Sequence, residues 1–257
     1  MLRFFRHIRQ SVIEKGQVKK YLLYAVGEIL LVVIGILLAL QVNNWNELQK
    51  EKKVEIKLLK EVQIDLEATM EEIIGDYEAH IQSQNSGNTF QRYLVENEIF
   101  NDTILMHYKH LSLDRQVYPK TSGYDLLQAK GMDIISNDSL RKEITDLYQL
   151  TFFRLVEFGQ SNEKFNIPKR LSPFDNKHFS IINIPASRYK TAGLIDSVTF
   201  YQKRLTNYAD LRNDNEFLRV LQSSFGLRRR KIFLHEWAIE DSKNVIFLIK
   251  EELKHLE

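Results

Sequence analysis

Residues 21–42 read YLLYAVGEILLVVIGILLALQV, and this stretch decides the fold of the chain. Between Ile29 and Leu40, only Gly35 interrupts a run of aliphatic residues. As an α-helix, a stretch of this length rises about 33 Å, which matches the hydrocarbon core of a bilayer. The sequence therefore predicts a transmembrane helix over residues 21–42.

Aromatic rings flank the predicted span. Tyr21 and Tyr24 lie at its start and Trp45 lies just beyond its end, so these three residues are predicted membrane-interface anchors. A buried helix of a soluble core is the alternative, and these flanks favour the membrane. A cleaved signal peptide is disfavoured because residues 39–41 (Ala-Leu-Gln) end in a bulky polar residue at the point where a small residue is needed.

The orientation of the span follows from the basic residues on its two sides. Six precede it, ending in Lys19 and Lys20, whereas the first one beyond it is Lys50. Basic residues next to a span favour the cytoplasmic side. The sequence predicts a cytoplasmic basic tail at residues 1–20, a single-pass transmembrane helix and an extracytoplasmic helical domain at residues 43–257.

Composition narrows the chemistry of this domain. The chain has 36 basic and 34 acidic residues, of which 30 and 32 fall after residue 42, so the domain is nearly neutral. A neutral domain has no electrostatic footprint for nucleic acid. The absence of cysteine excludes disulfides and thiolate chemistry. No hydrolase triad motif or phosphate-binding loop is present, so we expect neither an enzyme nor a cofactor, and composition names no small-molecule ligand.

The domain reads as an antiparallel helical bundle. From Asn46 to Gln84, apolar residues recur at spacings of three, four and seven, which predicts an amphipathic helix continuing directly from the span. A coiled-coil seam is the alternative, but Thr69 and Asp76 interrupt a strict heptad. The fold class expected is all-α, with the transmembrane helix leading into the bundle.

Local signals predict the remaining elements. A turn is expected at residues 85–88 (Asn-Ser-Gly-Asn), and Ile181–Ile184 is the single strand candidate. Ser122 is expected to cap a helix that stops before Gly131, and Asn137 or Asp138 is expected to begin the next. The other predicted segments are helices at about 88–97, 102–112, 197–225 and 227–255, and an irregular stretch at 166–197.

Three charged or histidine-containing patterns are weak candidates for chemistry. His107 and His110 lack further metal ligands nearby, and Glu252-x-x-His255 lacks the second such pair that a di-iron bundle requires. We therefore predict no metal site. The run at residues 228–231 (Arg-Arg-Arg-Lys) could bind an anionic lipid or an acidic partner, but a solvated helix face is the commoner explanation.

Glu28 stands out because it lies inside the predicted span. An ionisable residue at that depth is costly and marks a functional position by default. Its helical neighbours are mostly small, and Gly35-x-x-x-Ala39 is a close-packing motif. We predict a helix–helix interface on one stripe of the span, consisting of Ala25, Glu28, Val32, Gly35 and Ala39. A role limited to biogenesis and a proton- or ion-linked role are the alternatives.

Four stretches carry a resemblance to a known family. They are YAVGEILLVVIGILLALQVNNWNE at 24–47, RFFRHIR at 3–9, GYDLLQAKG at 123–131 and NDSLR at 137–141. The chain resembles uncharacterised single-span membrane proteins, widespread in Bacteroidota and known only as a domain of unknown function. The resemblance implies a bacterial inner-membrane protein with a helical extracytoplasmic domain, and it implies no activity.

Two functions fit these features. The first is a membrane-anchored interaction or scaffold protein of the cell envelope, whose partners are the lipid bilayer and either a second copy or another transmembrane helix. The second is an extracytoplasmic sensory or ligand-binding module that works through a membrane partner. The short tail at residues 1–20 holds no output domain, which favours the first.

Overall fold

The structure is a computed structural model that describes residues 18–96, 99–159, 162–185 and 199–257. The chain divides into two compact units, Met1–Ile56 and Lys57–Glu257. Helix α2 (Val18–Glu96) contributes residues to both. In the described residues the fold is all-α apart from one two-stranded sheet, as the sequence predicts.

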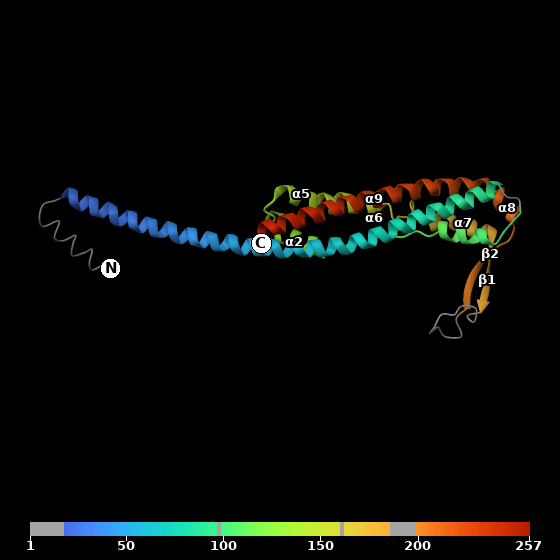
Figure 1. The fold of residues 1–257 in the computed structure, drawn as a ribbon, viewed down its shortest axis with the longest axis horizontal. Coiled ribbons are helices and arrows are strands. Elements are labelled where there is room, and N and C mark those ends of the chain that lie inside the picture. Colours follow the sequence, from blue (N-terminus) through green and yellow to red (C-terminus); the bar gives the residue numbers. More distant parts are fainter. Residues whose placement is uncertain (1–17, 97–98, 160–161, 186–198) are drawn as a thin grey trace. The chain divides into compact units, whose positions relative to one another are not determined.

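The first unit contains the apolar part of α2. Among the described residues, α2 is the one helix long and apolar enough to cross a membrane. Its most apolar 18-residue window has a mean hydropathy of 2.6, and none of that window is buried. The described part of this unit is helical throughout, so the predicted helix at residues 21–42 is confirmed (Figure 1).

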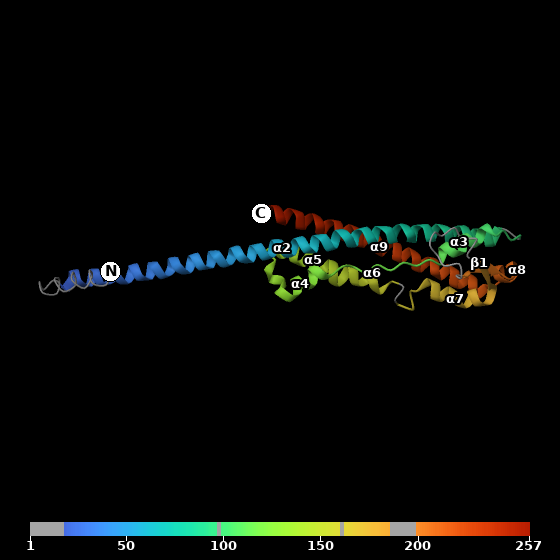
Figure 2. The same cartoon turned by 90° about the horizontal axis from the view of Figure 1, so that it is seen from below.

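The second unit is built on two long antiparallel helices. Residues 57–96 of α2 lie beside α9 (Asn215–Leu256), as Figures 1 and 2 show. Three hydrogen bonds fix their register: Lys60 donates to Glu257, Tyr77 to Glu236 and Gln91 to Gln222. As the residue number rises along α2 it falls along α9, which confirms the predicted antiparallel arrangement.

Shorter elements complete this unit. They are α3 (Thr103–Leu111), α4 (Ser122–Lys130), η1 (Met132–Ile134), α5 (Asp138–Asp146), η2 (Leu147–Phe152), α6 (Phe153–Glu157), α7 (Ile167–His178), β1 (Phe179–Pro185), β2 (Thr199–Leu205) and α8 (Tyr208–Arg212). Strands β1 and β2 pair antiparallel, with Phe179 opposite Leu205. Segment η2 is a π-helix between α5 and α6.

Several predicted boundaries are confirmed by local signals. The side chain of Asn137 accepts hydrogen bonds from the backbone N–H groups of Ser139 and Leu140, so it caps α5. Gly131 has a φ of 98° and ends α4. Helix α4 also begins at Ser122, but Thr121 is its N-cap residue, and the Ser122 hydroxyl donates to Asp65 of α2 instead of capping.

The predicted turn at residues 85–88 and the separate helix at 88–97 are wrong, because α2 continues to Glu96. Tertiary packing overrides the weak helix propensity of this stretch. A Cβ atom at Gly87 would lie 2.5 Å from Cε1 of Phe225, so the glycine lets α9 approach α2 closely. Gln84 also donates to Asn88 one turn later.

The predicted irregular stretch at 166–197 is also wrong, as are the first part of the predicted helix at 197–225 and its break from the next helix, whereas the predicted helix at 227–255 is confirmed within α9. In the described residues, this region forms α7 and β1, and the start of the predicted helix at 197–225 is β2. Pro168 lies in the first turn of α7, where its missing N–H is not needed. Helix α9 runs through Gly226, which is exposed. The strand candidate at Ile181–Ile184 is confirmed within β1.

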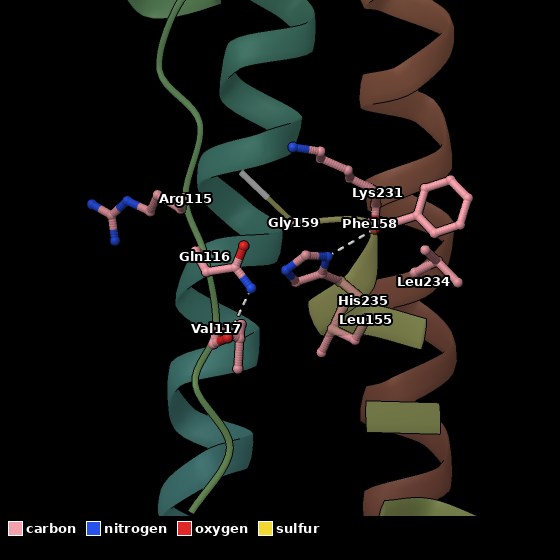
Figure 3. Close-up of a pocket in the computed structure, with 9 residues that line it drawn as sticks. All are labelled: Arg115, Gln116, Val117, Leu155, Phe158, Gly159, Lys231, Leu234 and His235. Carbon is pink, nitrogen blue, oxygen red and sulfur yellow. Dashed lines mark hydrogen bonds between the residues drawn. The ribbon is translucent and has the colours of Figure 1, made fainter. Parts of the chain in front are cut away.

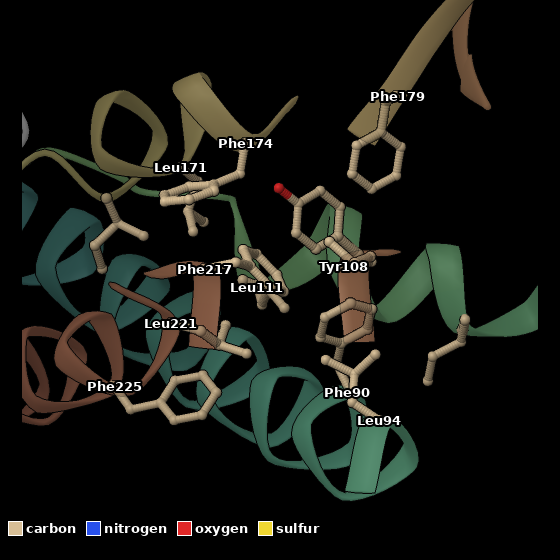
Figure 4. Packing of buried hydrophobic residues seen from close by; sticks show 13 residues of the cluster. Phe90, Leu94, Tyr108, Leu111, Leu171, Phe174, Phe179, Phe217, Leu221 and Phe225 are labelled. Atoms are coloured by element: carbon tan, nitrogen blue, oxygen red, sulfur yellow. The ribbon is translucent and has the colours of Figure 1, made fainter. Parts of the chain in front are cut away.

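An aromatic core closes one end of the second unit (Figure 4). The ring of Tyr108 stacks on Phe179 at 4.9 Å and lies 5.2 Å from Phe90. Phe217 of α9 and Leu171 of α7 are fully buried in the same cluster. The other end of the unit also has buried apolar residues, among them Leu59, Val62 and Leu66 of α2.

Candidate functional site

The predicted helix–helix stripe lies in the exposed part of α2. Val32 is 55% exposed, and Ala39 is also exposed. A Cβ atom at Gly35 would meet nothing within 4 Å, so packing within the described chain gives no reason for a glycine there. Ala25 and Glu28 are partly buried, and Glu28 makes an interaction within the chain. The helix places all five on one stripe, and their role stays a prediction.

The predicted interface anchors lie in the same helix. Tyr24 and Trp45 are 62% and 64% exposed. Their rings are therefore available to the headgroup zone of a bilayer. The side chain of Tyr21 lies outside the part of the chain that the structure describes.

A second candidate site lies inside the helical domain. The buried charge cluster consists of His80, Asp114, Arg228, Lys231 and His235. His80 belongs to α2, Asp114 to the segment between α3 and α4, and the other three to one face of α9. The side chains of Asp114, Arg228 and Lys231 are 0%, 3% and 2% exposed. Groups of this kind are rarely buried unless they are paired.

Arg228 is the most connected member of the cluster. Its Nη1 donates to Nδ1 of His80 at 2.7 Å and to Oδ1 of Asp114 at 3.2 Å. Its Nη2 donates to the backbone oxygens of Leu111 and Leu113. A single guanidinium thus joins α9 to α2 and to the end of α3, using the fork of donors that arginine provides.

Asp114 is the acceptor on which α7 and α9 converge. Its Oδ2 accepts from Nζ of Lys231 at 2.6 Å and from the backbone N–H of Ile167 at 3.2 Å. Its Oδ1 accepts from Arg228. This one carboxylate, whose side chain is fully buried, therefore binds two cations of α9 and the first residue of α7.

The partners of the two histidines fix their tautomers. Arginine can only donate, so Nδ1 of His80 accepts and its proton lies on Nε2. A backbone oxygen can only accept, so Nδ1 of His235 donates to the oxygen of Lys231, and Nε2 carries a lone pair. Both Nε2 atoms are buried, and neither has a hydrogen-bond partner among the described residues. The rings meet edge to face at 4.8 Å.

The electrostatics of the cluster keep both histidines neutral. Burial, followed by the charge of Arg228, lowers the pKa of His80 from 6.5 to about 2. Burial also lowers the pKa of His235. The pKa values of Arg228 and Lys231 fall for the same reason, with Asp114 opposing the change.

A small cavity adjoins His235. Its volume is about 10 Å³, and Gln116, Gly159 and Lys231 lie in its wall (Figure 3). That is room for about one water molecule, which could donate to the lone pair on His235 Nε2. It is far smaller than the roughly 300–1,000 Å³ of a ligand pocket. The cluster is therefore suited to fastening helices together.

The neutral histidines predict that the domain loses stability on mild acidification. Below pH 6.5 the imidazole of His80 takes up a proton in the unfolded chain but not in the folded one. The stability that the neutral ring contributes is therefore fully present above pH 6.5 and is lost as the pH falls toward about 2, the pKa in the folded chain. For His80 this difference lowers the free energy of unfolding by about 1 kcal/mol between pH 7 and 5.5. Thermal unfolding of the full chain at both pH values measures this, and His80→Gln should flatten the dependence. An equal decrease in the variant would contradict the assignment.

The sequence analysis missed this site. It predicted a solvated face for residues 228–231, which holds for Arg229 and Arg230 but is wrong for Arg228 and Lys231. A usable signal was present in the polar residues at core positions of both helices. On α2 these include Asp76, His80 and Ser83, and on α9 they are Ser224, Arg228, Lys231, His235 and Ser242.

The weaker metal candidates are placed apart from this cluster. Glu252 accepts a hydrogen bond from Asn137 of the α5 cap. His107 and His110 are partly buried on α3. In the described ranges, no group of three or more His, Cys, Asp or Glu side chains could hold a metal ion.

Comparison with known proteins gives one family. No curated protein and no solved structure matches the chain. A sequence profile described as "Family of unknown function (DUF6090)" matches residues 28–201, which is more than half of the chain. The match begins within the apolar part of α2 and extends into β2. The chain therefore belongs to this family of unknown function.

Proposed function

We propose that this chain is a membrane-anchored interaction protein of the bacterial cell envelope. Its span lies in the inner membrane with residues 1–20 in the cytoplasm, and the helical domain is presented on the other side. The observation that carries the proposal is the 18-residue apolar window of α2, of which no part is buried. An apolar surface of this length is unfavourable in water and suits a bilayer.

The buried charge cluster supports a role in contacts rather than catalysis. Its carboxylate and its two cations pair with one another. Their further hydrogen bonds to His80 and Ile167 connect α9 to α2 and α7. A domain held together in this way presents a defined surface to a partner. The partner we propose for the span is a second copy, through the stripe of Ala25, Glu28, Val32, Gly35 and Ala39.

The chain has no cysteine, so single cysteines test this interface on an unaltered background. Ala39→Cys should form disulfide-linked dimers in oxidised membranes, whereas Leu38→Cys, one position off the stripe, should not. Adding Gly35→Leu should abolish the Ala39→Cys product, because a bulky side chain blocks close approach of the helices. Gly27→Leu is the matched control, since Gly27 is equally open but lies off the stripe.

Retention of every variant in carbonate-washed membranes shows that the span is inserted. An impermeant maleimide that labels Asn46→Cys in spheroplasts tests the orientation. Equal cross-linking at Ala39 and Leu38, or an unchanged product with Gly35→Leu, would show that the stripe is not an interface.

A further inference from the structure

An open groove lies on the face of α2 next to α3. Its volume is about 510 Å³, which is the size of a small-molecule site. Its lining comprises residues of α2 together with His107 of α3; the residues of α2 are Tyr77, Glu78, Ile81, Gln82, Asn85, Ser86 and Thr89. All of these side chains except Ile81 can form hydrogen bonds. The groove is separate from the buried charge cluster and from the predicted span.

The sequence of α2 next to this groove has a low helix propensity. Residues 82–89 read QSQNSGNT, a run of residues that mostly disfavour a helix interior by about 0.5–1 kcal/mol each relative to alanine. Packing accounts for part of the run, because Gly87 admits Phe225 and Ser83 is buried. It does not account for Asn85, which is exposed and lines the groove. Positions that violate local propensity without a packing gain are expected at functional sites.

His107 provides an independent indication. Its Nδ1 is buried and has no hydrogen-bond partner among the described residues. A buried nitrogen left unpaired is costly, and a bound molecule is one way of satisfying it. This imidazole is the contribution of α3 to the lining, and the other lining residues belong to α2.

The chemistry of the lining selects the kind of ligand. Glu78 can only accept hydrogen bonds, and the lining that the structure describes has no lysine or arginine, so it favours neither a phosphate nor a carboxylate. The amides of Gln82 and Asn85 and the hydroxyl of Ser86 both donate and accept, which matches sugar hydroxyls. A single carboxylate is too little for a polyamine. We propose that this groove binds a neutral saccharide.

The proposal does not depend on dimerisation of the span, and cross-linking and ligand binding are measured separately. The test uses the full chain in phosphatidylcholine nanodiscs, because maltoside detergents would compete. Saturation-transfer NMR with maltose and N-acetylglucosamine as probes, followed by titration, should detect binding of at least one of them. Glucose 6-phosphate and spermidine should not bind at the groove.

Two asparagines of the same helix provide matched variants. Asn85→Ala should weaken saccharide binding by about tenfold, since an amide that pairs with the ligand is lost. Asn88→Ala should leave binding unchanged, because Asn88 lies outside the lining and pairs with Gln84. Both variants should keep the helical circular dichroism of the parent. Absence of binding by both neutral sugars, preference for either charged probe, or equal effects of the two variants would overturn the proposal.

Discussion

Asp114→Asn should lower the free energy of unfolding of the helical domain by about 4 kcal/mol, because it leaves two buried cations without their counter-charge. Arg228 and Lys231 both pair with this carboxylate, and its side chain is fully buried. Asparagine has the same shape, so the loss reports charge rather than volume. Thermal and urea unfolding of the full chain, followed by circular dichroism, measure the effect.

Three further variants make this result specific. Lys231→Met should cost much less, since Arg228 and Asp114 remain paired. Combining Lys231→Met with Asp114→Asn should cost less than the sum of the two changes, because the carboxylate and ammonium are coupled. Asp102→Asn is the surface control, as Asp102 is exposed and makes no side-chain cap bond. A loss below about 1 kcal/mol for Asp114→Asn would mean that the pair contributes no more than a surface ion pair.

The cluster also shows why the sequence predicts some features and misses others. Asn137 and Gly131 act on backbone groups within three residues, so their effect can be read locally. The burial of Arg228 depends on His80 and Asp114, which are more than one hundred residues away. Within the basic run at residues 228–231, the neighbouring sequence does not distinguish the residues that are buried against a partner from those that face solvent.

The same distinction explains the errors in element boundaries. At Gly87 the local sequence favours a turn, but the ring of Phe225 across the helix pair decides for a helix. Strand β2 was expected to be helical, and it forms because β1 pairs with it in register. The apolar spacing between Asn46 and Gln84 predicts the buried face of α2 from its period alone, and Leu59, Val62 and Leu66 on that face are buried.

Gly123→Ala should destabilise the domain by about 3 kcal/mol, because it forces a methyl group into a backbone contact that cannot move. A Cβ atom at Gly123 would lie 2.7 Å from the backbone nitrogen of Val62 and 2.8 Å from the carbonyl carbon of Glu61. The same place is held by Asp65, whose Oδ2 accepts from the Ser122 hydroxyl at 2.6 Å and from the Gly123 N–H at 2.7 Å. Displacing α4 to relieve the clash would therefore stretch both hydrogen bonds.

In the matched control, a glycine-to-alanine change should raise the free energy of unfolding instead of lowering it. Gly226→Ala lies inside α9, where a Cβ atom would meet nothing within 4 Å, and it should stabilise the domain by about 0.5–1 kcal/mol by restricting the unfolded chain. Thermal unfolding of the two variants at pH 7.5 compares the same chemical change in two surroundings. Opposite shifts in the midpoint would establish that α4 docks on α2 through backbone contact. Stabilisation by both variants would show that α4 stands farther from α2, and the hydrogen bonds from Ser122 and Gly123 to Asp65 would then be too long to hold it.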